Sequence, residues 1–422
     1  MTVKLPKPRI LWAAKDHPEI SSGYGVVGKH LLPRFAKEYG HENIFCYAPV
    51  GILGWRHQWK GIWTFGGNAP GYGEEFLESQ YNQYRCNLLL HVGDWFPLRL
   101  LPRLAHERKV FWVQWAPFDF LSIPADAKNI LLPAYKVVPW CQDAYERFQT
   151  LGIKENLAPP IPLGVDTDLW HPMTVDELMK DRYQPWKQLG FSPDTFNVTI
   201  IAANQRRKYL REQMEGLSIF CKMQPDAPVR LFLHSFLQMQ GERDLREDLF
   251  DLNLASFTRN PDQFILTQSG IKEEQMVQIV NCSSLVLNAC MEGMGMVQLQ
   301  AMAVGVPVIT LDEGPGKEIV QFGAYVSSIA ADYNMPIVRP IPNPLAIAEA
   351  IYKFYHECWL KGVRRSTKSR EHIIRHYSWD VIAQQWFKFM EEAMWYREKY
   401  SMYEPFPSKR LWKKSAEVME II

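Results

Sequence analysis

The sequence lacks the features that mark several classes of protein. Its seven cysteines are odd in number and include no C-x-x-C pair, which argues against both a disulfide framework and a zinc site. We therefore expect a reducing, cytoplasmic environment. No uninterrupted apolar run approaches the roughly 20 residues that a membrane span needs, and nothing resembles a signal peptide. The sequence also has no internal repeat and no low-complexity segment.

An excess of charge of either sign is missing as well. The chain has 47 basic and 46 acidic residues, so no global field attracts nucleic acid or an anionic membrane. A nucleic-acid partner stays possible through a local patch, but the net charge does not indicate one. With 47% apolar and 22% charged residues over 422 positions, the composition predicts a soluble globular protein of two or three domains.

The most informative stretch runs from Ser284 to Val320. It begins with a short apolar run, breaks at Glu292-Gly-Met-Gly295, continues as a helical segment and ends in a second apolar run. This order predicts a strand, a glycine turn, a helix and a second strand, which is one βαβ crossover of a parallel sheet. Two glycines beside a carboxylate let a ligand approach the backbone, and the first N–H groups of the helix favour an anion.

The same stretch resembles the donor-site signature of family 4 glycosyltransferases of the GT-B fold. The resemblance implies that Glu292 is a catalytic residue that holds the donor sugar, with Gly293, Met294 and Gly295 around it. A second Glu of the signature, which holds the ribose, is Gln300 here. The alternative is a generic Rossmann-like turn in which the Glu only caps a helix.

A basic turn follows the predicted strand Phe196–Ala203. In the resembling family an Arg or Lys and a second Lys bind the donor diphosphate here, and Arg207 and Lys208 match them. The family often has another Arg earlier on that turn, and this sequence has Ala203 in its place. Two fixed cations would stabilise the charge of a departing diphosphate. The alternative is a solvated basic turn without a ligand.

The first part of the chain begins with a predicted buried strand, Arg9–Ala14, and a helix that opens with a G-x-G-x-x-G pattern at 23–28. The loop before this pattern is too long for a dinucleotide site, and no acidic residue obviously ends a second strand. The resemblance instead implies that Gly23 and Gly25 face the donor. Further strands are predicted at Asn43–Ala48, Cys86–His91, Val110–Gln114, Tyr135–Trp140, Val229–Ser235 and Gln263–Thr267.

Polar residues follow two of these strands, where a doubly wound sheet binds its ligands. By resemblance, Gln114 takes the place of a His that contacts the donor sugar. His91, Asp94 and Asp119 are candidates for the acceptor side, and we count Asp94 and Asp119 with Glu292 as possible catalytic residues. A buried structural hydrogen bond is an equally good explanation for each of the three.

A proline-rich passage after residue 157 resembles the interdomain linker of the family. It predicts an acceptor-side domain at 1–163, a donor domain at 164–378 and a crossing helix with a tail at 379–422. Asp166 and Asp168 look like a metal-binding Asp-x-Asp, but they belong to the linker signature. We expect no metal and no cofactor beyond the donor itself.

These features together predict an α/β protein with two Rossmann-like doubly wound parallel sheets facing across a cleft, and a last helix that returns to the first domain. The resemblance implies a retaining glycosyltransferase, of the hexosyltransferase class, that uses a UDP- or GDP-sugar and an unidentified acceptor. Two alternatives stay open. One is an enzyme of the same fold that glycosylates a nucleic-acid base, and the other is a non-catalytic relative that binds sugar or nucleotide.

Overall fold

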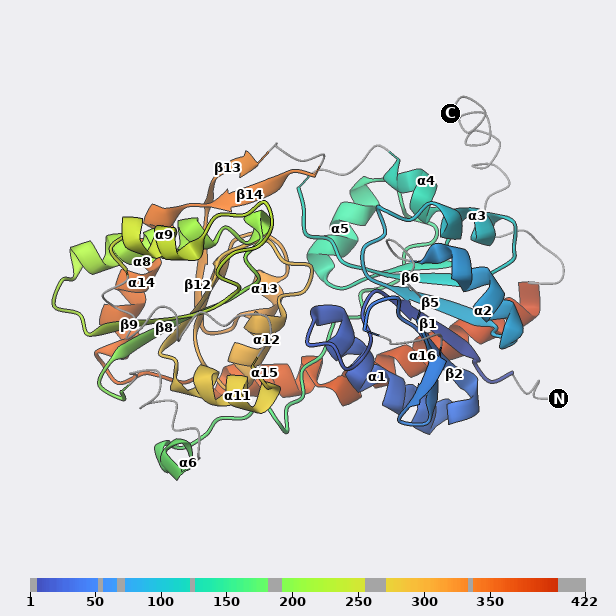
Figure 1. The fold of residues 1–422 in the computed structure, drawn as a ribbon, viewed down its shortest axis with the longest axis horizontal. Coiled ribbons are helices and arrows are strands. Elements are labelled where there is room, and N and C mark those ends of the chain that lie inside the picture. Colours follow the sequence, from blue (N-terminus) through green and yellow to red (C-terminus); the bar gives the residue numbers. More distant parts are fainter. Residues whose placement is uncertain are drawn as a thin grey trace. The chain divides into compact units, whose positions relative to one another are not determined.

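The computed structural model describes residues 6–51, 56–66, 73–121, 126–180, 192–254, 271–332 and 337–400. The chain divides into two compact units (Figure 1). The first consists of Met1–Phe118, Ile123–Leu163 and Trp379–Ile422, and the second of Asp119–Ser122 and Gly164–Ser378. The strand predicted at 263–267 lies outside the described residues.

The first unit is built on a sheet in the order β3-β4-β2-β1-β5-β6-β7. Its strands are parallel except β3, which runs antiparallel to β4. The central strands are mostly apolar and buried on both faces, as expected for a parallel sheet covered by helices. The strands are β1 (Ile10–Ala14), β2 (Ile44–Tyr47), β3 (Arg56–Trp59), β4 (Ile62–Phe65), β5 (Leu88–Val92), β6 (Trp112–Ala116) and β7 (Lys136–Pro139).

The hairpin β3–β4 was not predicted from the sequence. Trp59 pairs with Ile62 across a two-residue turn, Lys60-Gly61, in which both residues have positive φ (48° and 77°). This is the geometry of a type I′ hairpin turn, which Asn-Gly or Asp-Gly usually forms. The turn has a lysine in its first position, and β3 is polar and partly exposed, so the sequence shows neither the usual turn residues nor an apolar strand.

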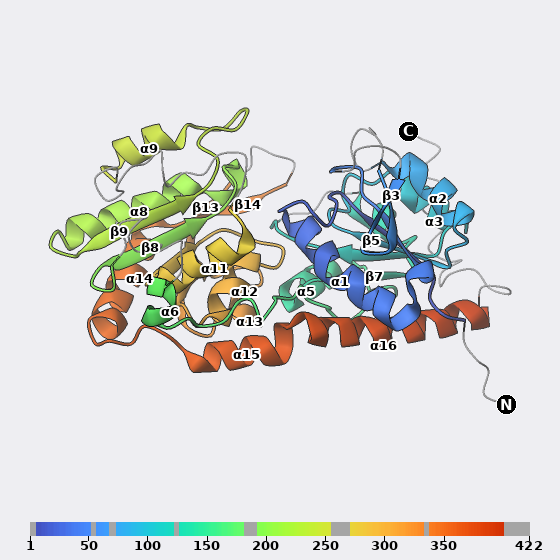
Figure 2. The same ribbon diagram turned by 60° about the horizontal axis from the view of Figure 1, so that its bottom comes forward.

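Helices cover the sheet of the first unit, and the last helix of the chain is one of them. Helix α16 packs along α1, where Trp379 stacks on His30 with ring centroids 5.2 Å apart and Phe387 contacts Phe35 (Figure 2). The prediction that the last helix returns to the first unit is confirmed. The helices are α1 (Gly23–Tyr39), η1 (His41–Asn43), η2 (Glu74–Phe76), α2 (Leu77–Gln83), α3 (Leu100–His106), α4 (Ala127–Leu131), α5 (Gln142–Thr150) and α16 (Trp379–Tyr400).

The second unit contains a parallel sheet in the order β12-β11-β10-β8-β9 and a separate antiparallel hairpin, β13–β14. The βαβ crossover predicted around Glu292 is confirmed, because β10 and β11 are parallel neighbours joined by α12. The strands are β8 (Phe196–Ile201), β9 (Val229–His234), β10 (Leu285–Asn288), β11 (Val308–Leu311), β12 (Gly323–Val326), β13 (Ser328–Asp332) and β14 (Arg339–Pro342).

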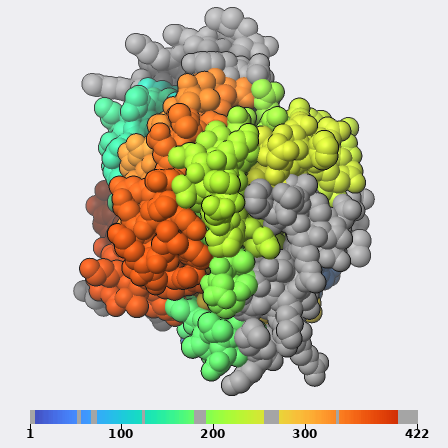
Figure 3. Space-filling view, turned by 90° about the vertical axis from the view of Figure 1, so that its left-hand side faces the viewer, coloured from blue at the N-terminus to red at the C-terminus, as the bar shows by residue number. Residues whose placement is uncertain are grey.

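The helices of the second unit enclose an apolar core of strand and helix side chains. On the outer face of this unit, the surface of α14 and η5 lies directly beside that of α8, and α9 lies on the other side of α8 (Figure 3). The helices are α6 (Val175–Lys180), η3 (Arg206–Lys208), α8 (Leu210–Met223), α9 (Leu245–Asp251), α11 (Glu273–Cys282), α12 (Met296–Ala303), α13 (Gly316–Ile319), α14 (Pro344–Phe354), η5 (Tyr355–Trp359) and α15 (Thr367–Tyr377).

None of the helices in the described ranges is long and apolar enough to cross a membrane.

Candidate functional site

The strongest candidate site lies in the second unit, where two neighbouring parallel strands end. The loop after β10 carries Glu292, and the short helix η3 after β8 carries Lys208. Their side chains meet, with Lys208 Nζ 2.5 Å from Glu292 Oε1. Both are largely buried, with 9% of the Lys208 side chain and 17% of the Glu292 side chain exposed. The sequence assigned both to the donor, and the fold brings them into direct contact.

The environment of Glu292 keeps its carboxylate ionised. Burial alone would raise its pKa, but the positive charges of Lys208 and Arg207 and the hydrogen bond from Lys208 outweigh burial and lower the pKa below its ordinary value. The thiol of Cys290 donates to Glu292 Oε1 at 3.4 Å, and burial raises the pKa of this thiol to about 12. The site therefore holds a fixed negative charge beside a fixed positive one at neutral pH.

Arg207 lies at the same turn and reaches a carboxylate from a distant part of the sequence. Its Nη1 is 3.2 Å from Asp119 Oδ2, and its Nε donates to Gln205 Oε1 at 3.1 Å. Asp119 also accepts from Arg339 Nη2 through both carboxylate oxygens, each at 3.1 Å. The sequence placed Asp119 in the acceptor-side domain, whereas the structure groups it with the second unit as the partner of two arginines.

The sequence analysis missed Gln213, which connects the two halves of this site. Its Nε2 donates to the carbonyl of Lys208 at 2.7 Å, and its Oε1 accepts from the amide of Ala289 at 3.0 Å. The side chain has no exposed surface and ties the turn after β8 to the end of β10. A glutamine within the buried face of α8, beside Leu210, Met214 and Leu217, was the signal that could have revealed it.

The glycine turn leads from Glu292 into helix α12. Gly293 and Met294 are buried, and Gly295 is the N-terminal flanking residue of α12 with φ of 69°, a left-handed conformation that suits glycine. Gln300 is half-buried on α12. The buried polar residue of this helix is a different one, Gln298, whose Nε2 donates to Thr310 Oγ1 at 2.8 Å.

In the first unit, the side chain of Gln114 is hydrogen-bonded inside the protein. This residue has no exposed surface, and both ends of its amide are engaged: Oε1 accepts from His91 Nδ1 at 2.9 Å, and Nε2 donates to the carbonyl of Gly93 at 2.9 Å. Burial lowers the pKa of His91 to about 4, although the hydrogen bond to Gln114 opposes this. Gln114 and His91 are thus internal partners on β6 and β5. Asp94, just beyond β5, is half-buried.

Gly23 and Gly25 lie at the start of α1, but only one of them is required by packing. A Cβ at Gly25 would lie 2.1 Å from the carbonyl oxygen of Ile20, whereas a Cβ at Gly23 would have nothing within 4 Å. The amide of Gly25 also donates to Ser22 Oγ, which caps the helix. Gly25 therefore lets the preceding loop fold against the helix.

We expect Gly25→Ala to lower the free energy of unfolding by about 1–3 kcal/mol, as overpacking does when backbone must move. Gly23→Ala is the matched control, and it should cause no loss because the position is open and helical. Urea unfolding of both variants checks this. Equal losses of stability in the two variants would contradict the packing account.

The Asp-x-Asp of the linker has a structural role. Asp166 Oδ1 accepts from the amides of Asp168 and Leu169, each at 3.1 Å, and so closes a turn of the type that Asp commonly stabilises. Within the described ranges, no group of three or more His, Cys, Asp or Glu side chains is arranged to hold a metal ion.

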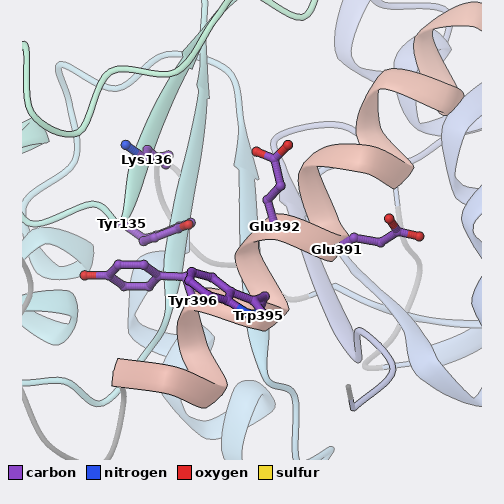
Figure 4. Close-up of a pocket in the computed structure, with 6 residues that line it drawn as sticks. All are labelled: Tyr135, Lys136, Glu391, Glu392, Trp395 and Tyr396. Carbon is purple, nitrogen blue, oxygen red and sulfur yellow. The ribbon is translucent and has the colours of Figure 1, made fainter. Parts of the chain in front are cut away.

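A surface cavity of about 490 Å³ lies in the first unit between the start of β7 and α16. Figure 4 shows its lining, with the rings of Tyr135, Trp395 and Tyr396 close together and the carboxylates of Glu391 and Glu392 on the helix above them. Because Tyr135 precedes β7, this cavity lies at the amino end of that strand, away from the strand ends that usually bind ligands.

Comparisons with known proteins agree with this arrangement. Residues 237–357 match the family described as "Glycosyl transferases group 1". The structure is similar over 92% of the chain to sucrose-phosphate synthase from Thermosynechococcus elongatus, at 15% identity, a TM-score of 0.70 and 99% coverage of that chain. The chain has the GT-B fold, and part of its second unit matches a family of glycosyl transferases.

Two further solved structures resemble this protein. HepE from Anabaena, solved with UDP-glucose, has 14% identity and a TM-score of 0.67, over 91% of this chain and 99% of HepE. An E. coli protein titled "Trehalose-6-phosphate", bound with UDP-2-fluoro glucose, has 10% identity and a TM-score of 0.65, over 91% and 99% of the two chains. A search of curated proteins found no match to the chain. At these identities the likenesses establish the fold.

Proposed function

We propose that this protein is a glycosyltransferase that moves a sugar from a nucleotide-diphospho-sugar to an acceptor with retention of configuration. The observation that carries the proposal is the buried Lys208–Glu292 pair with Arg207 beside it, at the carboxyl ends of β8 and β10. Two cations and one carboxylate match the needs of a donor that loses a diphosphate and develops positive charge on its sugar ring.

In this proposal each group has a separate task. Arg207 and Lys208 neutralise the diphosphate, assisted by the N–H groups at the start of α12 next to Gly295. Glu292 accepts hydrogen bonds from donor-sugar hydroxyls. UDP-glucose and UDP-2-fluoro glucose, the ligands named for two of the similar structures, support a UDP-sugar as donor, and GDP-sugars belong to the same test.

The reaction breaks the bond between the anomeric carbon and the phosphate oxygen. The electron pair of that bond leaves with the nucleoside diphosphate, whose new charge Arg207 and Lys208 stabilise. The acceptor oxygen bonds to the anomeric carbon on the face that the diphosphate leaves, and the proton of the acceptor hydroxyl passes to an oxygen of the departing diphosphate. Glu292 steadies the positive charge that builds up on the ring between these events.

We further propose that the reaction needs no metal ion, because side-chain cations stand where a metal would otherwise neutralise the diphosphate. We also propose the cytosol as its location, consistent with seven cysteines that are all free thiols.

A thermal-shift panel of UDP, GDP, ADP and their sugars tests the donor proposal directly. A ligand at about 100 times its dissociation constant adds roughly 2.7 kcal/mol to the free energy of unfolding, which gives a clear shift of the melting temperature. We expect one nucleoside diphosphate and its sugars to stabilise the protein. The proposal fails if none of them does.

A second candidate function is a non-catalytic protein that binds sugar or nucleotide, and Gln300 favours it because an amide stands where the family has a second carboxylate. Hydrolysis of the donor in the absence of acceptor separates the two functions. An enzyme releases nucleoside diphosphate above the uncatalysed rate, and a binding protein does not.

Gln300 leads to a prediction of its own. A carboxylate can accept from both ribose hydroxyls, whereas an amide offers one acceptor and one donor group. We therefore expect Gln300→Glu to tighten nucleoside diphosphate binding about three- to tenfold, the effect of one stronger hydrogen bond. Isothermal titration calorimetry checks this. Unchanged or weaker binding would show that Gln300 does not form hydrogen bonds with the ribose hydroxyls.

A further inference from the structure

Arg207 does not point freely toward a ligand in this structure, because a carboxylate already holds it. Its Nη1 contacts Asp119 Oδ2 at 3.2 Å. Asp119 is held more firmly by Arg339, whose Nη2 donates to both carboxylate oxygens and whose Nε donates to the Asp119 carbonyl at 2.8 Å. The carboxylate of Asp119 therefore sits between two guanidinium groups.

The backbone fixes Asp119 in this position. The amide of Leu121 donates to the carbonyl of Val338 at 2.6 Å, which attaches the segment after Asp119 to the residue before β14. The Arg339 side chain is 12% exposed and the Asp119 side chain 15%, whereas Arg207 is 35% exposed. Arg207 is thus the partner with the most freedom to leave the carboxylate.

The neighbouring residue of the turn makes a parallel contact. Arg206 Nε is 2.8 Å from Asp332 Oδ2, and Asp332 stands opposite Arg339 in the β13–β14 hairpin. The three arginines and two aspartates alternate in charge and attach the η3 turn to the hairpin. An entering diphosphate would be a third anion for this cluster, and Arg207 lies next to Lys208, where the proposed function places that diphosphate.

We propose that Asp119 is an internal counter-anion that competes with the donor diphosphate for Arg207, and that Arg339 retains Asp119 when Arg207 is released. The inference rests on the proposed function, since it needs a nucleoside diphosphate at Arg207. Asp119 then keeps the empty donor site neutralised and ordered, and it weakens nucleotide binding by the strength of its contact with Arg207. This role differs from the acceptor-side role that the sequence predicted.

The test measures the affinity of UDP and GDP by calorimetry for the wild type, three single variants and one double variant. Asp119→Asn removes the competing charge, so nucleotide should bind about two- to fivefold more tightly, as expected for a partly exposed ion pair. Asp332→Asn is the matched control, because it removes an equal charge from the same cluster but from the partner of Arg206. It should tighten binding by less.

Arg339→Gln should act in the opposite direction. It leaves Asp119 with Arg207 alone, so nucleotide should bind about two- to fivefold more weakly. In the Asp119→Asn background, Arg339→Gln should have no effect, because it acts only through Asp119. Melting temperatures of all variants verify that each is folded at the temperature of the titration.

The outcomes separate this inference from the proposed function. If the wild type binds neither UDP nor GDP, both are overturned. If the wild type binds nucleotide and Asp119→Asn does not bind it more tightly than Asp332→Asn does, only the counter-anion role is overturned. If Asp119→Asn lowers turnover and leaves nucleotide affinity unchanged, Asp119 belongs to the acceptor side. Weaker binding in both Asp119→Asn and Arg339→Gln would mean that the two residues only support the turn.

Discussion

Glu292→Gln should lower kcat by a factor on the order of 100 or more while leaving nucleoside diphosphate affinity undiminished. The substitution keeps the shape of the side chain and removes its charge, so the loss falls on the interaction that strengthens as the sugar ring becomes positive. A factor of 100 corresponds to about 2.7 kcal/mol of the activation free energy. The Lys208 ammonium, no longer paired with a carboxylate, stays available for the diphosphate.

The measurement is the release of nucleoside diphosphate from the donor that the thermal-shift panel identifies. Because Lys208 and Glu292 form a largely buried pair, the variant should also lose stability on the order of 1–3 kcal/mol, so its melting temperature is determined first. Glu212→Gln is a suitable control, since it makes the same change at a half-buried carboxylate of α8 outside the site. A Glu292→Gln variant with normal kcat and weakened nucleotide binding would make Glu292 a binding residue.

Replacing Arg207 and Lys208 together with Ala should cost about 2–4 kcal/mol of transition-state stabilisation, which is roughly a 30- to 1,000-fold loss of kcat/KM. Both cations lie on η3, where two adjacent phosphates would be neutralised. Nucleoside diphosphate affinity should fall as well, in contrast to the effect of Glu292→Gln. This difference between the two variants distinguishes stabilisation of the negative charge on the leaving diphosphate from stabilisation of the positive charge on the sugar ring.

The double variant needs its own controls. Removing Lys208 leaves the Glu292 carboxylate buried without its main partner, and breaking a buried pair in this way costs about 3–5 kcal/mol of stability. Activity is therefore compared well below the melting temperature of the variant. Arg206→Ala changes the adjacent arginine, which pairs with Asp332 and is 58% exposed, and it should have a small effect. Near-normal turnover in the double variant would rule out the diphosphate assignment.

The fold was predictable from the sequence wherever burial requires a continuous run of apolar residues. β1 is a continuous apolar run, and β10 is apolar in its first three residues, because helices cover both faces of their sheets. The glycine turn after β10 marks the start of α12. The β3–β4 hairpin was missed because its turn uses Lys60-Gly61 and its outer strand is polar. Edge strands of this kind carry little hydrophobic signal.

The site was only partly predictable, because its charges come from separate parts of the chain. The sequence indicated a helix start beside Glu292, but the cations that keep its carboxylate ionised are Lys208 and Arg207. They lie on η3 and reach Glu292 because β8 pairs with β10. Nothing in the sequence indicated that Asp119 would join the second unit, or that Arg339 would hold it there. Gln114 shows the reverse case, a polar residue within β6 whose hydrogen bonds are satisfied internally.

The most direct test of the donor site is a crystal structure of the protein with the nucleoside diphosphate that stabilises it most. We predict that the diphosphate lies within hydrogen-bonding distance, about 3 Å, of Lys208 Nζ and the Arg207 guanidinium, with Arg207 no longer bonded to Asp119. The Glu292 carboxylate should face the position of the donor sugar. A nucleotide bound elsewhere, with the Lys208–Glu292 and Arg207–Asp119 contacts unchanged, would contradict the account.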